Sequence, residues 1–376
     1  MEVLFFNFFY SEISGQNQDK FSGYISSTGC WIHKDAIELQ GLKKGPFIHL
    51  ADSSILAVEN FSRCCISKDQ GGTWIEYPIV ANENEFDTSK FEITTGALLR
   101  TQSGVIILPF MNHKERSEFI WDKNTHDTSN DPSYPTYAVR SLDGGKTWTD
   151  LKKLHNDWTG AIRDIIETQD GNIVFTSMMF LHNPGRNAVV TYTSKDEGKS
   201  WIRSNIIDLG GIGHHSGVME STLEQLSDGR LWMLLRTNWG KFWEIYSEDE
   251  GLTWNHYNPT EIDASTAPGI LSRMLSGRLV LVWNRYYPEG VTECRLIGGD
   301  ANFSEVPVSF HRQELSIMFS DDNGKSWSKP VVIARTMDKK SQLAYPYIIE
   351  AKPGELWIKT SFQGNLGLKL FEKDFM

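Results

Sequence analysis

The stretch Ser320-Asp-Asp-Asn-Gly-Lys-Ser-Trp327 decides the fold, because its pattern, S-x-D-x-G-x-[TS]-W, occurs five times in the chain. The copies begin at Ser67, Ser141, Ser194, Ser247 and Ser320, so successive starts lie 74, 53, 53 and 73 residues apart. Propeller blades are supersecondary units of about 40–50 residues that stack side by side. The spacing therefore predicts a β-propeller with insertions in two of its blades.

Each residue type in the repeated pattern has a local structural reason to be there. The Asp side chain accepts hydrogen bonds from the backbone of a tight turn, and the Gly supplies a positive φ. The Trp then anchors the start of the next strand. We therefore expect a structural turn and assign no chemistry to the five Asp residues Asp69, Asp143, Asp196, Asp249 and Asp322.

A second pattern, an apolar strand, a turn and another apolar strand, precedes each copy. Its turns centre on six residues, Ser53, Gly104, Gly171, Gly229, Gly277 and Gly354. The last unit, from Tyr345 to Phe375, has no S-x-D-x-G-x-[TS]-W pattern after it. The N-terminal segment, whose residues Met1–Tyr10 are apolar and predict a strand, is the natural donor of the missing outer strand. We expect an all-β fold: a six-bladed β-propeller of four-stranded antiparallel blades, as one domain over residues 1–376.

Composition narrows the classes of partner. The net charge of −11 argues against a nucleic-acid surface, which needs a basic face, although a local Arg cluster can still attract an anionic ligand. The four cysteines, Cys30, Cys64, Cys65 and Cys294, have neither zinc-site nor disulfide-framework spacing, so we expect free thiols, no metal and no cofactor.

Membrane and export signals are not recognised in the chain. No apolar run approaches the roughly 20 residues of a membrane span. The N-terminus carries Glu2 and has neither a basic region nor a small-residue cleavage site. The expectation is a soluble protein, cytoplasmic by default, and secreted or periplasmic if a leader has been removed. The oligomeric state stays open.

Residues at the start of each inner strand face the propeller axis, where ligands usually bind. Nine positions before the six turn centres stand Lys44, Thr95, Ile162, Glu220, Pro268 and Tyr345. A Lys, a Glu and a Tyr therefore converge among neutral residues. Solvated polar strand ends are the structural alternative.

The repeated pattern resembles the Asp-box of the sialidase superfamily, and three segments resemble parts of its active site. Ala344-Tyr-Pro-Tyr347 is similar to the segment that supplies a nucleophilic tyrosine, which implies that role for Tyr345. Glu220 resembles the carboxylate that polarises this tyrosine, and Arg236 and Arg312 resemble two arginines that bind the substrate carboxylate. An Arg presents a planar fork that matches a carboxylate.

Two features depart from the resemblance. Where sialidases have an aromatic-Arg-Ile-Pro segment, this chain has Leu42-Lys-Lys-Gly-Pro-Phe47, so Lys43 or Lys44 is expected to replace the remaining arginine. The loop that carries the Asp general acid in sialidases contains no Asp here, and Glu59 is the nearest carboxylate, with a structural role as its alternative.

Four further residues, His214, His215, Arg285 and Arg163, lie near the inner strand ends. His214 and His215 precede Glu220 in a loop, where they could contact substrate, replace the proton donor, or simply form ordinary loop hydrogen bonds. Arg285 is expected to line the pocket, whereas Arg163 is interpreted as structural.

The resemblance implies an exo-acting glycoside hydrolase that removes a terminal acidic sugar, sialic acid or a related carboxylated sugar, from a glycan or glycoconjugate. A hydrolase for another acidic glycan is the alternative within the enzyme class. A carbohydrate-binding propeller without catalysis is the alternative outside it.

Overall fold

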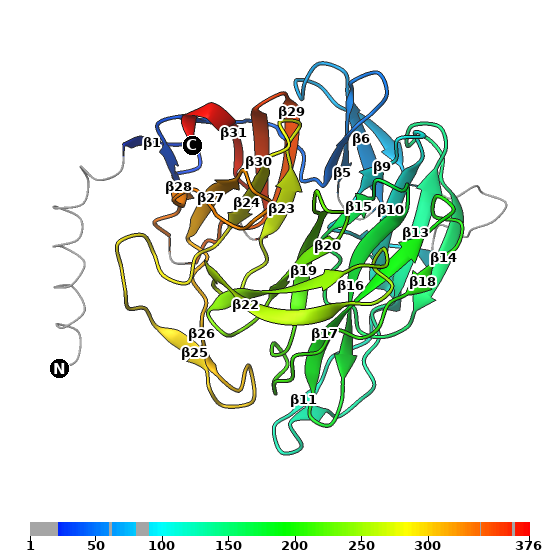
Figure 1. Ribbon diagram of the computed structural model, residues 1–376, viewed down its shortest axis with the longest axis vertical. Helices are drawn as coiled ribbons and strands as arrows, with labels where there is room; N and C mark the ends of the chain where they lie inside the picture. The colour runs from blue at the N-terminus through cyan, green and yellow to red at the C-terminus, as the bar shows by residue number, and fades with distance from the viewer. Residues whose placement is uncertain (1–21, 60–61, 80–89, 339, 363–364) are drawn as a thin grey trace.

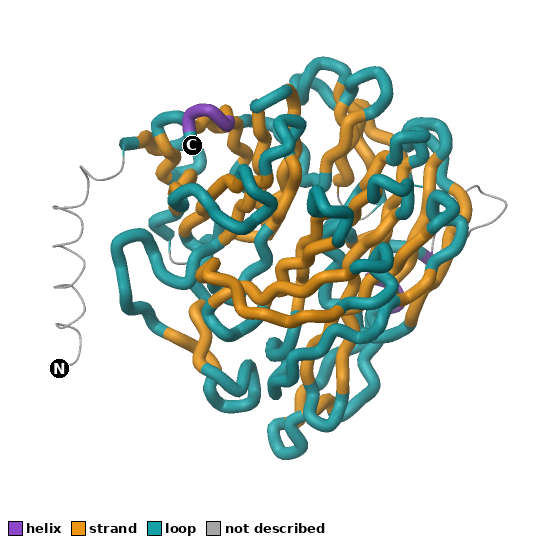
Figure 2. The backbone as a smooth tube through the Cα atoms, in the orientation of Figure 1, coloured by secondary structure: helices purple, strands orange, loops and turns teal. Residues whose placement is uncertain are grey.

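The computed structural model describes residues 22–59, 62–79, 90–338, 340–362 and 365–376. The segment Met1–Tyr10, predicted to be a strand, lies outside the described residues. Strands and turns dominate the described ranges, as Figure 2 shows. The described ranges contain no α-helix, and their 3-10 segments include η3 (His113–Glu115) and η4 (Glu372–Asp374).

Six antiparallel sheets of four or more strands stand around a common centre as the blades of a propeller, which confirms the predicted all-β, six-bladed fold (Figure 1). Blade 1 contains β4 (Phe47–His49), β5 (Ile55–Glu59), β6 (Arg63–Ser67) and β7 (Ile75–Pro78). Blade 2 contains β8 (Ile93–Thr94), β9 (Leu99–Arg100), β10 (Ile106–Asn112), β13 (Thr136–Ser141) and β14 (Thr149–His155). Blade 3 contains β15 (Ile165–Glu167), β16 (Ile173–Leu181), β17 (Arg186–Ser194) and β18 (Ile202–Arg203).

The remaining blades come from the second half of the chain and from its N-terminal strands. Blade 4 contains β19 (Met219–Gln225), β20 (Leu231–Arg236), β21 (Lys241–Ser247) and β22 (Asn255–Asp263). Blade 5 contains β23 (Ile270–Arg273), β24 (Leu279–Trp283), β27 (Glu314–Ser320) and β28 (Val331–Arg335), extended by β2 (Trp31–His33) and β1 (Gly23–Ile25). Blade 6 contains β29 (Ala344–Lys352), β30 (Glu355–Phe362), β31 (Gly367–Phe371) and β3 (Ala36–Glu38). Two hairpins, β11 (Trp121–Asp122) with β12 (Asp127–Thr128) and β25 (Leu296–Gly298) with β26 (Pro307–Ser309), lie in inter-strand loops.

The N-terminal strands join the two ends of the described chain. Strand β3 pairs with β31, and β2 pairs with β28 of the preceding blade. The blue β1 therefore lies beside the red C-terminal strands in Figure 1. Since β2 and β3 belong to different blades, the chain between them crosses from blade 5 to blade 6.

The turns that join the first and second strands have the predicted centres. All six central residues, Ser53, Gly104, Gly171, Gly229, Gly277 and Gly354, have a positive φ. Glycine adopts that conformation without a steric penalty, and Ser53 is the one exception among the six.

The five repeated motifs all form the same hydrogen-bonded turn between the two outer strands of a blade. In blade 4, the Ser247 hydroxyl donates to Asp249 Oδ1 at 2.8 Å and accepts the Gly251 N–H at 2.9 Å. The backbone N–H and the hydroxyl of Thr253 donate to the two Asp249 oxygens at 2.8 and 2.7 Å. The other four motifs repeat this arrangement.

The glycine of each motif also packs against the neighbouring blade. A Cβ on Gly324 of blade 5 would lie 2.6 Å from the Trp232 ring of blade 4, and one on Gly251 would lie 2.8 Å from Val174 of blade 3. A Cβ on Gly145 would lie 2.4 Å from Leu56 of blade 1, and one on Gly198 would lie 2.7 Å from Ile107 of blade 2. At Gly71 the contact is looser, 3.3 Å from the Trp357 ring of blade 6. A side chain at these positions would clash with the neighbouring blade, so the glycine of the motif allows the two blades to pack closely.

Blade 6 has no such motif, and the C-terminal η4 covers the junction between blades 5 and 6 instead. The Glu372 carboxylate accepts from Arg278, beside the inner turn of blade 5, at 2.7 Å. Phe375 is buried in a hydrophobic cluster that contains Val280 of blade 5 and Leu356 of blade 6. Five of the junctions between neighbouring blades are therefore formed with a motif turn, and the sixth is covered by the C-terminal segment.

Candidate active site

Tyr345 and Glu220 meet at the centre of the ring, although they come from blades 6 and 4. The Tyr345 hydroxyl donates to Glu220 Oε1 at 2.8 Å. Tyr345 is the second residue of β29, and Glu220 is the second residue of β19. The Glu220 side chain is only 9% exposed, so its charge requires partners inside the protein.

Arg236, the last residue of β20, supplies the main charge partner of Glu220. Its guanidinium donates to Glu220 Oε2, to the Tyr345 hydroxyl at 3.3 Å and to Thr266 Oγ1 at 2.9 Å. The Arg236 side chain is 2% exposed. Arg236, Glu220 and Tyr345 thus form one buried, hydrogen-bonded group.

Arg312 reaches the same group from blade 5. Its guanidinium lies 5.6 Å from the centroid of the Tyr345 ring and 4.1 Å from that of Phe310. It also donates to the Thr266 carbonyl oxygen, so Thr266 connects Arg312 with Arg236. The structure therefore brings together four of the residues singled out in the sequence: Glu220, Arg236, Arg312 and Tyr345.

Arg163, interpreted from the sequence as structural, is the third arginine of the cationic cluster. Its guanidinium lies 5.3 Å from the Tyr345 ring centroid and 5.1 Å from that of Tyr347, and it donates to the Pro346 carbonyl at 2.9 Å. Arg163 directly follows Ile162, which is the position that the comparison of inner strands selected for blade 3. Extending that comparison by one residue would have found it.

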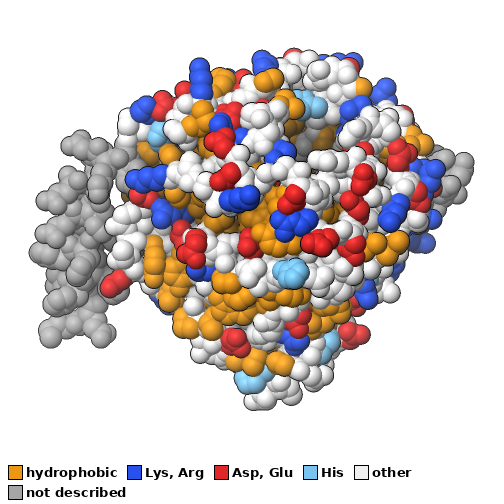
Figure 3. Space-filling model, in the orientation of Figure 1, with side chains coloured by type: hydrophobic (Ala, Val, Ile, Leu, Met, Phe, Trp, Pro, Cys, Tyr) orange, Lys and Arg blue, Asp and Glu red, His pale blue; other side chains and the backbone are white. Residues whose placement is uncertain are grey.

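The three arginines set the electrostatics of the cluster. Burial alone would raise the pKa of Tyr345, but the charges of Arg236, Arg312 and Arg163 lower this pKa below the ordinary value of a tyrosine. Burial lowers the pKa of Arg236 to about 10, and the two other arginines act in the same direction. Acidic and basic side chains are interspersed across the face seen in Figure 3. The positive charge around Tyr345 is therefore local, in a chain of net charge −11.

The backbone of Tyr345 is strained. Its φ is 55°, in the left-handed region that an aromatic residue rarely adopts. Such a conformation costs about 1–3 kcal/mol and persists where surrounding contacts hold it. Here the Ser361 hydroxyl donates to the Tyr345 carbonyl at 2.8 Å, while β29 and β30 pair on both sides through Ala344 and Pro346. The strain directs the Tyr345 side chain toward the arginines.

His214 and His215 lie beside the arginine cluster. Their rings contact each other through Nδ1, and the His215 ring stacks on Phe303 with a centroid distance of 4.8 Å. Partial burial lowers the pKa of His215 to about 3, and the charges of His214, Arg236 and Arg312 act in the same direction. A ring that is neutral down to this pH does not serve as the proton donor near neutral pH, so the proton-donor alternative for His215 is disfavoured.

Lys43 and Lys44 do not join the cluster. Lys43 pairs with Glu76 of β7 at 3.4 Å, and the exposed Lys44 donates its backbone N–H to Glu59 at 2.8 Å. Both lysines line a separate cavity of about 460 Å³ together with Glu59. Within the described ranges, Arg163 rather than either lysine is the third cation beside Tyr345.

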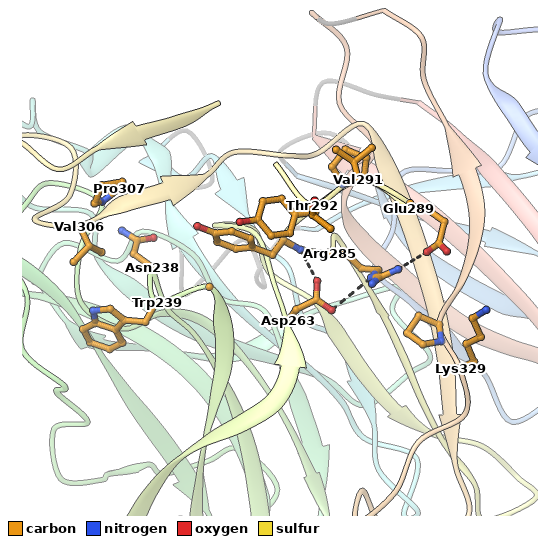
Figure 4. Close-up of a pocket in the computed structure, with 16 residues that line it drawn as sticks. Asn238, Trp239, Asp263, Arg285, Glu289, Val291, Thr292, Val306, Pro307 and Lys329 are labelled. Atoms are coloured by element: carbon orange, nitrogen blue, oxygen red, sulfur yellow. Dashed lines mark hydrogen bonds and ion pairs between the residues drawn. The ribbon is translucent and has the colours of Figure 1, made fainter. Parts of the chain in front are cut away.

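Arg285 lies in a different pocket from the one expected. Its guanidinium pairs with Asp263 at 3.5 Å and with Glu289, and it lines a cavity of about 870 Å³ between blades 4 and 5 (Figure 4). Because two carboxylates already neutralise Arg285, it is poorly suited to hold a substrate carboxylate.

Metal-binding clusters and membrane-spanning helices are both absent from the described part of the chain. No group of three or more His, Cys, Asp or Glu side chains there could hold a metal ion. In the same ranges, no helix is both long and apolar enough to cross a membrane.

Comparison with protein families and curated proteins gives one family match and two similar proteins. The model of the BNR repeat-like domain matches residues 59–358. A sialidase of Clostridium perfringens is 27% identical over 220 residues, which cover 54% of this chain and 54% of that protein. A sialidase of Paraclostridium sordellii is 26% identical over 252 residues, covering 61% and 59%. The chain thus spans between a half and three fifths of the length of these relatives.

Solved structures with the same fold include sialidases. The Hadza microbial sialidase Hz136 superposes with a TM-score of 0.60 at 14% identity, covering 92% of this chain and 68% of that one. The NanB sialidase of Streptococcus pneumoniae gives 0.55 at 12% identity, covering 90% and 70%. A protein of unknown function from Dyadobacter fermentans gives 0.57 at 13% identity, covering 89% and 96%. At these identities the likeness is evidence of the fold alone.

Proposed function

Because the chain belongs to the BNR repeat-like family and has a sialidase-like propeller, we propose that it is a glycoside hydrolase that removes a terminal acidic sugar from glycoconjugates. The observation that carries the proposal is the contact between the Tyr345 hydroxyl and Glu220 inside a cluster of three buried arginines. Sialic acid is the first candidate sugar, and the curated relatives that match the chain are sialidases.

The arginines supply binding. Arg163, Arg236 and Arg312 carry three positive charges against the single carboxylate of Glu220, so the cluster has an excess of positive charge for an anionic group. A guanidinium in a water-poor site holds a carboxylate through charge-assisted hydrogen bonds. Their charges also make the Tyr345 hydroxyl more acidic, which favours its use as a nucleophile.

Tyr345 and Glu220 supply the chemistry. The Tyr345 oxygen attacks the anomeric carbon while its proton passes to Glu220, the bond from that carbon to the aglycone oxygen breaks, and the aglycone takes a proton from solvent. Water then attacks the anomeric carbon of the glycosyl–tyrosine intermediate and releases a proton, and the tyrosine oxygen recovers its own from Glu220. A neutral tyrosine avoids the repulsion that a carboxylate nucleophile would meet from the acidic sugar.

A binding propeller without catalysis is the second candidate. It is favoured by the sequence of the loop that resembles the one carrying the Asp general acid of sialidases, because that loop contains no Asp. A substrate with a sugar aglycone needs a proton at the leaving oxygen, and this loop lacks the residue that would give it.

The test is fluorophore release from an aryl α-sialoside by the purified protein and by Tyr345→Phe, between about pH 4 and pH 8. The aryl leaving group needs little protonation, so the assay reports on nucleophilic attack. Turnover that falls by at least about a thousandfold in the variant supports the hydrolase. Equal turnover in both proteins contradicts the role of Tyr345, and binding of sialic acid without turnover supports the second candidate.

A further inference from the structure

A cavity between blades 4 and 5 has the lining of a sugar site. It has a volume of about 870 Å³ and lies between the loops that follow β20, β22 and β24. Trp239, Tyr286 and Tyr287 contribute aromatic surface, and Asn238, Asp263 and Arg285 contribute hydrogen-bonding groups. Figure 4 shows Asp263 between Asn238 and Trp239 on one side and Arg285 and Glu289 on the other.

The aromatic surface is built by specific contacts. The backbone N–H of Tyr286 donates to Asp263 at 2.8 Å, and its carbonyl accepts from the Ser309 hydroxyl. Its ring covers Gly240, where a Cβ would lie 3.2 Å from the ring. The Tyr287 ring stands perpendicular to that of Tyr286, with centroids 4.6 Å apart. The tyrosine pair is therefore positioned by the protein before any ligand arrives.

Charge in this cavity is balanced. Arg285 pairs with Asp263 and Glu289, and Lys329 adds a second cation at the wall. Two carboxylates thus meet two cations, whereas the cluster around Tyr345 has three cations and one carboxylate. Asp263 is 40% exposed and Glu289 33% exposed, so oxygen atoms of both remain open to a ligand. A neutral ligand rich in hydroxyl groups fits this balance better than an anion.

We propose that the cavity between blades 4 and 5 binds the neutral sugar rings of a glycan. Aromatic faces pack against the C–H surfaces of a pyranose ring, and carboxylates accept hydrogen bonds from its hydroxyl groups. A cavity that combines aromatic walls with a few fixed polar groups is the usual form of a small-ligand site.

The chain segment after β20 links the two sites, which gives the cavity a place in the substrate. Arg236 of the arginine cluster is two residues from Asn238 of the cavity, and Asn238 donates to the His215 carbonyl and to the Ser304 hydroxyl at 3.0 Å. A glycan whose acidic end lies on the arginines would extend its next rings into the cavity. This assignment of adjacent sugars rests on the proposed function, whereas binding of a neutral sugar does not.

The first experiment measures binding of lactose, a neutral disaccharide, to the full chain by ligand-observed NMR and calorimetry. The wild type should bind lactose, and Trp239→Ala and Tyr287→Ala should each raise Kd by about tenfold, equivalent to about 1.4 kcal/mol. Tyr246→Ala is the matched control, because Tyr246 lies in the same blade at the opposite end of β21. An equal loss in all three variants, or no lactose binding by the wild type, would overturn the proposal.

The second experiment separates the cavity from the catalytic proposal. The ratio of kcat/KM for sialyllactose to kcat/KM for methyl α-sialoside should fall about tenfold in Trp239→Ala. Hydrolysis of sialosides by a protein that does not bind lactose would overturn the cavity and leave the hydrolase. Lactose binding that depends on Trp239 in a protein without hydrolysis would support the cavity and remove the proposed function.

Discussion

The guanidinium of Arg163 lies 5.3 Å from the centre of the Tyr345 ring, although the two residues are separated by half of the propeller. Arg163 comes from the segment before β15 in blade 3, and Tyr345 begins the inner strand of blade 6. Their contact spans the axis. It makes Arg163 the third cation of the cluster and lowers the pKa of the tyrosine hydroxyl together with Arg236 and Arg312.

Replacement of this arginine should weaken substrate binding and change the acidity of Tyr345. In Arg163→Met, kcat/KM for an aryl α-sialoside should fall by about 10- to 100-fold, because a charge-assisted contact is worth about 1.5–3 kcal/mol. The Tyr345 pKa should rise, so the pH profile of kcat should shift toward higher pH. Lys43→Met is the control, since Lys43 pairs with Glu76, and should change kcat/KM by less than about threefold. A larger loss of kcat/KM in Lys43→Met than in Arg163→Met would contradict this assignment and favour Lys43 as a substrate-binding residue.

His215 should remain neutral in the range where a free histidine titrates. Partial burial, together with the neighbouring His214, Arg236 and Arg312, lowers its pKa to about 3. The Cε1–H NMR signal of His215, assigned with His215→Asn, should therefore keep a constant chemical shift from about pH 8 to about pH 5. A midpoint between about pH 6 and pH 7 would contradict the lowered pKa and restore His215 as a candidate proton donor.

The free energy of unfolding should decrease as the pH is lowered, because of His155. The side chain is buried, with hydrogen bonds to the Tyr192 hydroxyl at 2.7 Å and to Thr159 at 2.6 Å, and burial lowers its pKa from 6.5 to about 4. Between these values the unfolded state binds a proton that the folded state does not. The free energy of unfolding from this group is thus fully present above pH 6.5 and falls by about 1.4 kcal/mol per pH unit toward pH 4.

Urea unfolding at pH 7.5 and pH 5 measures this dependence (about 2 kcal/mol from His155 alone). In His155→Gln the difference between the two pH values should shrink by that amount. His256→Asn changes an exposed histidine and should keep the dependence of the wild type. An unchanged pH dependence in His155→Gln would show that the group is protonated in the folded protein.

The C-terminal segment should contribute to the stability of the whole ring. Phe375→Ala removes a buried ring from the cluster between blades 5 and 6 and should cost about 3–5 kcal/mol of unfolding free energy. Glu372→Gln leaves Arg278 without a charged acceptor on η4 and should cost about 1–3 kcal/mol. Lys373→Ala, an exposed change in the same turn, should have little effect in the same thermal and urea measurements.

The fold was predictable because its signal is local and repeated. Each motif needs only its own Ser, Asp, Gly and Thr or Ser to form the turn, and all five form it. The turn centres were equally clear, since positive φ favours glycine at a fixed distance from each inner strand. Neither inference required knowledge of any contact between blades.

The candidate site was predictable only where a residue stands at a repeated position. Glu220 and Tyr345 occupy equivalent places in two blades, and the structure brings them together. Arg163 is one residue beyond the equivalent position in blade 3, Ile162, so the comparison of inner strands did not select it. Lys43 and Arg285 were expected to bind substrate, but their pairing with Glu76 and with Asp263 depends on side chains that meet only in the folded protein.

The uneven closure of the ring places the site at the junction that has no motif turn. A linear array of repeats frays from its ends, whereas a closed ring has no end until one junction opens. Five junctions carry a motif turn, and the sixth, between blades 5 and 6, relies on η4 and on the chain that crosses from β2 to β3. Arg312 and Tyr345 stand on the two sides of that junction. If this junction opens before the others, Arg312 and Tyr345 separate while every blade is still folded. Activity is then lost while most of the β-structure remains.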